Sequence, residues 1–567
     1  MDLKFGHAPT WGGVLAWWNR RRPYTLPGCW VAFALASLSF TPSLIPRPAL
    51  FQAVLAGITA VIGYGLGVLG ARIWREFADR PPRSPRTGAW RTFGVVAATV
   101  LVASLMLGVW WQRQVSELVG LAPQTPFAAV LIPPVGVLVF VLLVGVGRFL
   151  TSASRRLAGR LADHMGERAA RALGVLLVVA VLLLTVNGVV SRVVVDVVDS
   201  AFSVRDTTTA DGVVRPQGPE RSGGPGSLVD WDELGLEGRT FVARGPSAAS
   251  IEAANGRPAK NPIRAYAGLD GAEDAVARAQ LAVRDLERAG GFARANLLVA
   301  TTTGTGWVEP SSASAFEYLS DGDSAIVSMQ YSFLPSPLSF VADKERARDS
   351  GRALFDAVYE KWSALPPADR PRLYVFGESL GSFGAEAAFS GDHDLANRTS
   401  GALFVGPPSF NPLYRGFVDR REASSREVEP EYREGQIIRF TTSPAEPTEP
   451  VDRAWARSRV LYLQHASDPI TWWSPDLILQ RPDWLEEPRG SDVLGATRWI
   501  PFVTFWQLTA DMALGMDPGP GHGHNFSGEH VDAWATIMQP EGWTAERAAL
   551  LKPVIRATMS DPYAPTP

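Results

Sequence analysis

Long apolar runs near the start of the chain constrain its fold more than any other feature. Residues 28–198 contain almost no acidic residues, whereas most Asp and Glu lie in 200–567. A helix needs about 20 apolar residues to cross a bilayer. Segments of this kind occupy 26–45, 49–70, 93–111, 127–147 and 173–191. The sequence therefore predicts a helical membrane domain over 1–200, with a Gly- and Pro-rich linker at 201–235.

Arginines are distributed unevenly among the loops that join these segments. They cluster before the first segment, between the second and third, and between the fourth and fifth. The other two loops contain only Arg47 and Arg113. Because cytoplasmic loops carry the excess of Arg and Lys, five spans would place everything after about residue 200 outside the cytoplasm.

Composition excludes several classes of function. The formal net charge of −3 provides no basic face for a nucleic acid. Cys29 is the only cysteine, so neither a disulfide within the chain nor a cysteine-based metal site is possible. His522 and His524 form a pair without a third metal ligand at suitable spacing. We expect no metal and no cofactor.

The chain after residue 235 alternates between strand-like and helix-like stretches. Such alternation predicts the α/β class, with a mainly parallel sheet and helices on both faces. We expect strands at 240–245, 263–268, 296–303, 324–333, 372–376, 401–406 and 459–464. The charged and Pro-rich region 419–450 departs from this rhythm, and either a lid or a surface excursion fits it.

A serine between two glycines follows one of these strands. RLYVF at 372–376 leads into GESLG at 377–381, and a helix-like run of small residues comes next. A G-x-S-x-G turn between strand and helix exposes the serine hydroxyl beside helix amides. This context favours Ser379 as a nucleophile over the alternative, a small-residue helix N-terminus.

A serine nucleophile needs a base and an acid that orients the base. Asp468 follows the strand at 459–464, where the acid is expected, although it could also cap a helix before Pro469. Asp476 is the nearest rival and lies further from the strand end. His522 and His524 follow in a Gly-rich loop; we favour His524 as base and keep His522 as the alternative. His530 fits packing or solvent contact better.

Two backbone segments are candidates for an oxyanion hole. One amide comes from the residue after the nucleophile, here Leu380, and the other from the loop after an earlier strand. TTTGTGW at 301–307 occupies that second position, which makes Thr303 and Gly304 candidates. An ordinary tight turn is the alternative interpretation of this loop.

With GESLG, the SDP stretch at 467–469 and GHGHNF at 521–526 in this order, the chain resembles the α/β-hydrolase superfamily. More narrowly, FTPSLIPR at 40–47 together with GHGHNF resembles an actinobacterial group of membrane-anchored α/β-hydrolases with an N-terminal multi-helix domain. The resemblance covers nearly the whole chain. It implies an α/β-hydrolase fold over 236–567, esterase or lipase-like activity, and the triad Ser379, Asp468 and His524.

One departure from that pattern concerns the histidine. No clean short strand precedes the histidine loop, and WIPFVTFWQLTADMAL at 499–514 fits either a strand or a helix.

These features predict a multi-pass protein of the cell membrane, with its catalytic domain outside the cytoplasm. Its substrate would be a carboxylic ester of a lipid or an acylated envelope component. Acyl transfer from the same acyl-enzyme to an alcohol is one alternative. A membrane transport or signalling protein with a non-catalytic hydrolase-like domain is another, although few ionisable residues lie within the apolar segments. Four tryptophans fit either an acyl pocket or core packing: Trp307, Trp472, Trp473 and Trp484.

Overall fold

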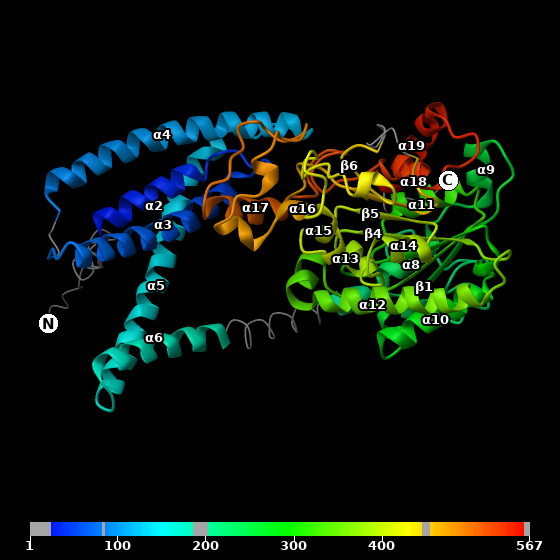
Figure 1. Ribbon diagram of the computed structural model, residues 1–567, viewed down its shortest axis with the longest axis horizontal. Helices are drawn as coiled ribbons and strands as arrows, with labels where there is room; N and C mark the ends of the chain where they lie inside the picture. Colours follow the sequence, from blue (N-terminus) through cyan, green and yellow to red (C-terminus); the bar gives the residue numbers. More distant parts are fainter. Residues whose placement is uncertain (1–23, 82–84, 185–201, 445–453, 561–567) are drawn as a thin grey trace, which may run out of the picture.

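The computed structural model describes the chain apart from residues 1–23, 82–84, 185–201, 445–453 and 561–567. Long helices from the N-terminal third lie at one end of the molecule, and a sheet with its covering helices lies at the other (Figure 1). The N-terminal helices are α2 (Leu26–Leu38), α3 (Ala49–Phe77), α4 (Thr87–Leu118), η1 (Pro126–Leu131), α5 (Ile132–Ala162) and α6 (Glu167–Leu184).

Among the described residues, three helical stretches are long and apolar enough to cross a membrane. They are Ala49–Phe77, Thr87–Leu118 and Pro126–Ala162, and they contain the second, third and fourth predicted segments. Pro133 and Pro134 lie in the first turn of α5, where a missing N–H costs nothing. These prolines therefore start a helix instead of bending one.

The first predicted segment, 26–45, is helical only in part, which corrects that prediction. Helix α2 ends at Leu38, and a mostly buried turn at 39–48 follows it. Pro42, Pro46 and Pro48 prevent a regular helix in this turn. Helix α6 covers the start of the fifth predicted segment, whose residues 185–191 lie outside the described part of the chain.

The other end of the molecule contains a seven-stranded sheet in which every neighbouring pair is parallel. Its spatial order is β1-β3-β2-β4-β5-β7-β6. The strands are β1 (Ile263–Ala267), β2 (Asn296–Thr301), β3 (Ser324–Met329), β4 (Arg372–Glu378), β5 (Gly401–Val405), β6 (Ile438–Thr441) and β7 (Arg459–Leu463). Their residues are almost all buried, as expected for a parallel sheet covered on both faces.

Two apolar cores cover the two faces of this sheet. One contains side chains of α10 (Ala275–Arg288), α12 (Ser336–Ala364), α13 (Leu380–Glu386) and α15 (Pro412–Val418). The other contains side chains of α8 (Gly235–Ala243), α9 (Ala248–Asn255), α11 (Pro310–Leu319), α18 (His530–Met538) and α19 (Ala545–Ser560). Helix α14 (Asp392–Arg398) precedes β5. This arrangement confirms the predicted α/β-hydrolase fold with a helical N-terminal part.

Three local predictions need correction or completion. Residues 240–245 were expected to form a strand, but most of them belong to α8, because a short apolar run does not by itself distinguish strand from helix. The region 419–450 contains edge strand β6, so this part belongs to the sheet and not to a lid. Within the predicted linker, Ser222 N donates to Arg264 O on β1, so that part packs against the sheet.

The ambiguous stretch 499–514 contains helix α17 (Val503–Met512). Helix α17 lies between the two ends of the molecule and packs against α3 (Figure 1). The short helix α16 (Pro469–Trp472) precedes it and follows β7. Helix α17 therefore joins the N-terminal helices to the loop that carries the candidate histidines.

Candidate active site

Ser379 occupies a sharp turn between β4 and α13. Its φ of 54° and ψ of −126° lie in a region that non-glycine residues rarely adopt. The surrounding structure holds this conformation: Ser379 N donates to Val405 O of the adjacent strand at 2.8 Å. A strained serine at such a strand-to-helix turn is the geometry of a nucleophile elbow.

The two glycines of the turn are required by close backbone contacts. A Cβ atom at Gly377 would lie 2.5 Å from Gly381 O, and one at Gly381 would lie 2.6 Å from Thr301 O. No real side chain tolerates such contacts with backbone atoms. The glycines therefore let α13 start directly beside the end of β2.

Asp468 and His524 are brought together from separate loops. Asp468 follows β7, and its Oδ2 accepts a hydrogen bond from His524 Nδ1 at 2.7 Å. Asp468 Oδ1 also accepts from Ile470 N at 2.8 Å, so the carboxylate caps α16 as well. Both side chains are buried. This arrangement fixes the imidazole so that its Nε2 faces away from the carboxylate.

The ring of His524 lies against Gly406, directly after β5. A Cβ at Gly406 would be 2.4 Å from His524 Cε1, so only glycine leaves room for the ring. Ser379 is bonded to Val405, the residue before Gly406. Within the described part of the chain, His524 Nε2 is buried and has no hydrogen-bond partner. A buried ring nitrogen without a partner suits a group that exchanges a proton with substrate or nucleophile.

The pKa of His524 reflects two opposing effects. Burial lowers the pKa, but the Asp468 carboxylate and its hydrogen bond raise it by more, so the net direction is upward from 6.5. The imidazolium that forms when this histidine accepts a proton is therefore stabilised.

The rival residues lie elsewhere. His522 Nδ1 is 3.6 Å from Asp492 Oδ2, and about a third of its side chain is exposed. Asp476 lies at the surface, where its Oδ2 is 3.5 Å from Arg415 Nη2. Within the described part of the chain, neither His522 nor Asp476 forms a hydrogen bond or an ion pair with Asp468 or His524.

The start of α13 lies against the beginning of the other predicted oxyanion segment, since a Cβ at Gly381 would lie 3.2 Å from Thr302 O. Leu380 begins α13, where the first N–H groups have no partner within the helix. The Thr303 N–H donates to Trp307 O at 2.9 Å and is therefore engaged within its own loop. Thr303 and Trp307 line a cavity of about 360 Å³. Trp472 and Trp484 are buried, pack against each other and line a second cavity of about 280 Å³.

Sequence reasoning missed a buried polar cluster behind the nucleophile. His530 Nε2 lies 3.0 Å from Oε2 of Glu378, and its Nδ1 lies 2.8 Å from Ser311 Oγ. Ser311 Oγ donates in turn to Glu309 Oε1 at 2.7 Å. Glu378 is the variable residue of the GESLG motif, so nothing in the motif itself indicated this role.

His465 was also missed, although it is adjacent to the SDP stretch. Its Nδ1 lies 2.8 Å from Gly523 O, its Nε2 lies 2.7 Å from Glu529 Oε2, and its ring stacks on Phe526. These contacts of His465 fix Gly523 and Phe526, which flank His524 in the histidine loop. No group of three or more His, Cys, Asp or Glu in the described residues has the arrangement of a metal site.

Comparison with known families gives two matches that together cover most of the chain. Residues 263–551 match a family described as "Alpha/beta-hydrolase family", and residues 40–246 match one described as "Alpha/beta-hydrolase family N-terminus". The first match contains all seven strands and includes Ser379, Asp468 and His524. Comparisons with curated proteins and with solved structures gave no match.

Proposed function

Because the chain belongs to the alpha/beta-hydrolase family, we propose that it is a membrane-anchored serine hydrolase that cleaves a carboxylic ester. The reaction would proceed through an acyl-enzyme on Ser379. The observation that carries this proposal is the buried His524 ring, which is bonded to Asp468 through Nδ1 and has a free Nε2 beside the strained serine turn.

In the proposed mechanism, His524 Nε2 takes the hydroxyl proton while Ser379 Oγ attacks the ester carbon. The amides of Leu380 and Gly304 stabilise the negative oxygen that results. His524 then returns the proton to the leaving alcohol, and the acyl group stays on Ser379. A water molecule, deprotonated by the same histidine, then attacks the acyl carbon. The bond to Ser379 Oγ breaks, His524 returns its proton to that oxygen, and the carboxylic acid is released. Asp468 keeps the ring in the required orientation throughout.

The arrangement of the helices supports an extracytoplasmic catalytic domain. The ends of the helices that contact the catalytic part are poor in arginine: the turn at 39–48 binds α17, and Val119 O accepts from Gly519 N at 3.0 Å. Arg72 and Arg75 lie near the end of α3, Arg91 lies near the start of α4, and the arginines at 148–160 lie in the second half of α5, away from these contacts. Since arginine-rich ends face the cytoplasm, this distribution of arginines supports the orientation whatever the number of spans.

We assign residues 1–200 to the membrane domain and 236–567 to the catalytic domain, with 201–235 between them. The substrate class would be a lipid ester or an acylated envelope component in the actinobacterial setting that the sequence resemblance implies. The contact with the membrane domain favours a substrate at the bilayer surface. The cavity beside Thr303 and Trp307 offers a place for part of that substrate.

Labelling with a fluorophosphonate probe in isolated membranes tests the mechanism. We expect the wild type to be labelled and Ser379→Ala to lose the label, while Ser390→Ala, at an exposed serine in the same chain, keeps it. Equal labelling of wild type and Ser379→Ala would overturn the mechanism.

Release of the acyl group only after an alcohol is added would indicate transfer in place of hydrolysis. A C-terminal reporter active in the cytoplasm would contradict the orientation.

A further inference from the structure

The buried turn at 39–48 contacts α17 through two side chains of that helix. Gln507 Nε2 donates to Thr41 O at 2.9 Å, and Asp511 carries the charged contact near the helix end. Asp511 Oδ2 accepts hydrogen bonds from Leu44 N at 3.1 Å and Ile45 N at 3.4 Å. Its Oδ1 accepts from Arg47 Nη1 at 3.3 Å, and neither side chain of this ion pair is exposed. A buried charge pair of this kind is costly to break, because the remaining partner stays buried without compensation.

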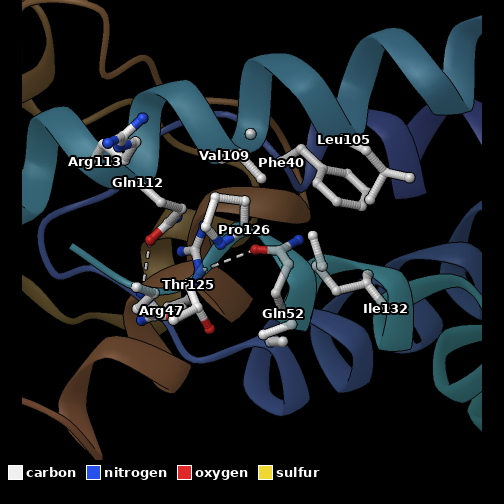
Figure 2. A pocket seen from close by; sticks show the side chains of 15 residues that line it. Phe40, Arg47, Gln52, Leu105, Val109, Gln112, Arg113, Thr125, Pro126 and Ile132 are labelled. Carbon is white, nitrogen blue, oxygen red and sulfur yellow. Dashed lines mark hydrogen bonds between the residues drawn. The ribbon is translucent and has the colours of Figure 1, made fainter.

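Arg47 is held in turn by the N-terminal helices. Figure 2 shows its bonds to Gln52 of α3, through Nε at 3.2 Å, and to Gln112 of α4, through its backbone N at 2.7 Å. Its Nη1 also donates to Ser43 Oγ at 2.5 Å, and its Nη2 to Thr41 O at 3.3 Å. Arg47 therefore connects α3 and α4 to the Asp511 carboxylate of α17 by hydrogen bonds.

Backbone hydrogen bonds connect Asp511 to the candidate base. Asp511 O accepts from Leu514 N at 2.9 Å, which turns the chain at the end of α17. Gly515 O, one residue later, accepts from His524 N at 2.7 Å. Between these points, Gly519 N donates to Val119 O at the end of α4. The segment 511–524 is therefore fixed to the N-terminal helices at two places and carries His524 at its end.

We propose that Arg47 is a positioning residue for catalysis, which acts through Asp511 to set the place of His524 beside Ser379. This inference rests on the proposed function. Its consequence is that the N-terminal helices form part of the framework of the active site and do more than attach it to a membrane. Misplacement of a catalytic group by about 1 Å can cost roughly 100-fold in rate.

The test uses the full chain in detergent, with Arg47→Met, Arg47→Lys, Asp511→Asn and the double variant Arg47→Met/Asp511→Asn. Arg113→Met is the matched control, because Arg113 is exposed and lines the same small cavity beside Arg47 (Figure 2). The rate of fluorophosphonate labelling at Ser379 is measured against pH, at saturating probe, for the folded fraction of each variant.

We expect Arg47→Met to label at least roughly tenfold more slowly than wild type, with the midpoint of its pH profile shifted downward as the contact between His524 and Asp468 loosens. Arg47→Lys should recover part of the rate, and the double variant should label no more slowly than Arg47→Met, since both changes act on one contact. Arg113→Met should label like the wild type.

An unchanged labelling rate and pH midpoint in Arg47→Met would overturn the inference. A loss of stability alone would reduce the folded fraction but would leave the pH profile of labelling in the folded molecules unchanged. If Arg47→Met cannot be recovered folded, the same labelling rate and pH midpoint are measured for Asp511→Asn. This variant retains an oxygen acceptor for the Leu44 and Ile45 amides, and an unchanged rate and midpoint in it would likewise overturn the inference. Absence of labelling in the wild type would instead reject the proposed function itself, so the two failures are distinguishable.

Discussion

His530 Nε2 lies 3.0 Å from Oε2 of Glu378, the residue immediately before Ser379 in the chain. Both side chains are buried. We expect His530→Ala to lower the free energy of unfolding by about 3–5 kcal/mol, because it leaves the Glu378 carboxylate buried without its partner. Thermal unfolding in detergent measures this loss. His393→Ala, at an exposed histidine, is the control and should unfold like the wild type; an equally stable His530→Ala would contradict the expectation.

The same cluster should make stability depend on pH. Burial raises the pKa of Glu309 from 4.5 to about 7, and the Glu378 carboxylate adds to this effect. For His530, burial lowers the pKa, but the hydrogen bond and charge of Glu378 raise it by more, so it lies above 6.5. Both folded-state pKa values are thus raised, and the folded chain retains protons that the unfolded chain has released.

Stability should decrease as pH rises, because the folded-state pKa values of Glu309 and His530 both lie above their unfolded values. The stabilisation from Glu309 is complete below its unfolded pKa of 4.5 and is lost as pH rises through about 7, and that from His530 is lost above 6.5. We expect stability to fall between about pH 5.5 and 8 by on the order of 2 kcal/mol. Melting temperatures across this range measure the change. Glu309→Gln should reduce the slope, whereas a wild-type melting temperature that rises with pH would refute the assignment.

The two neighbouring histidines should differ sharply in their effect on turnover. We expect His524→Ala to lower kcat for a p-nitrophenyl ester by roughly 10⁶-fold, as removal of the histidine does in a triad protease. His522→Ala should retain most of the wild-type activity, because His522 faces Asp492 and not Asp468. The reverse order of effects would assign the base to His522.

The pH profile of the reaction provides a separate check on Asp468. His524 acts as a base only when neutral, so kcat should rise with pH through a midpoint above 6.5. Asp468→Asn removes the carboxylate that raises this pKa, so the midpoint should shift downward while the rate falls. An unshifted midpoint in Asp468→Asn would show that another group sets the profile.

The glycines of the nucleophile turn should be far less replaceable than other helix-start glycines. Gly381→Ala places a Cβ 2.6 Å from Thr301 O, and we expect a loss of stability of at least about 1–3 kcal/mol from this overpacking. Gly391→Ala is a matched control, since Gly391 lies at the N-terminus of another helix, α14, and its Cβ would meet no atom within 4 Å. Comparable stability of the two variants, measured by thermal unfolding, would contradict the close contact.

Local chemistry explains which parts of the fold and site could be predicted. The strand, turn and helix around Ser379 follow from a β-prone run, two glycines and small residues that are adjacent in sequence. The position of Asp468 just after a strand could be predicted, because the apolar run of that strand is continuous. The order of serine, acid and histidine then limited the choice of base to a few residues.

The features that could not be predicted depend on contacts between distant segments. The stretch 499–514 is apolar because α17 packs against α3, not because it belongs to the sheet. FTPSLIPR seemed to continue a membrane helix, but its arginine pairs with Asp511, more than 460 positions away. The pairing of His530 with Glu378 spans 152 positions. No periodicity or motif in one sequence encodes such pairs.

The most direct test of the central claim is to identify the residue that carries the acyl group. The full chain is incubated briefly with a p-nitrophenyl ester, quenched in acid, digested and mapped by mass spectrometry. We predict one acyl group per chain on the peptide that contains Ser379, and none in Ser379→Ala. An acyl group on a different residue, or ester hydrolysis that persists unchanged in Ser379→Ala, would contradict the account.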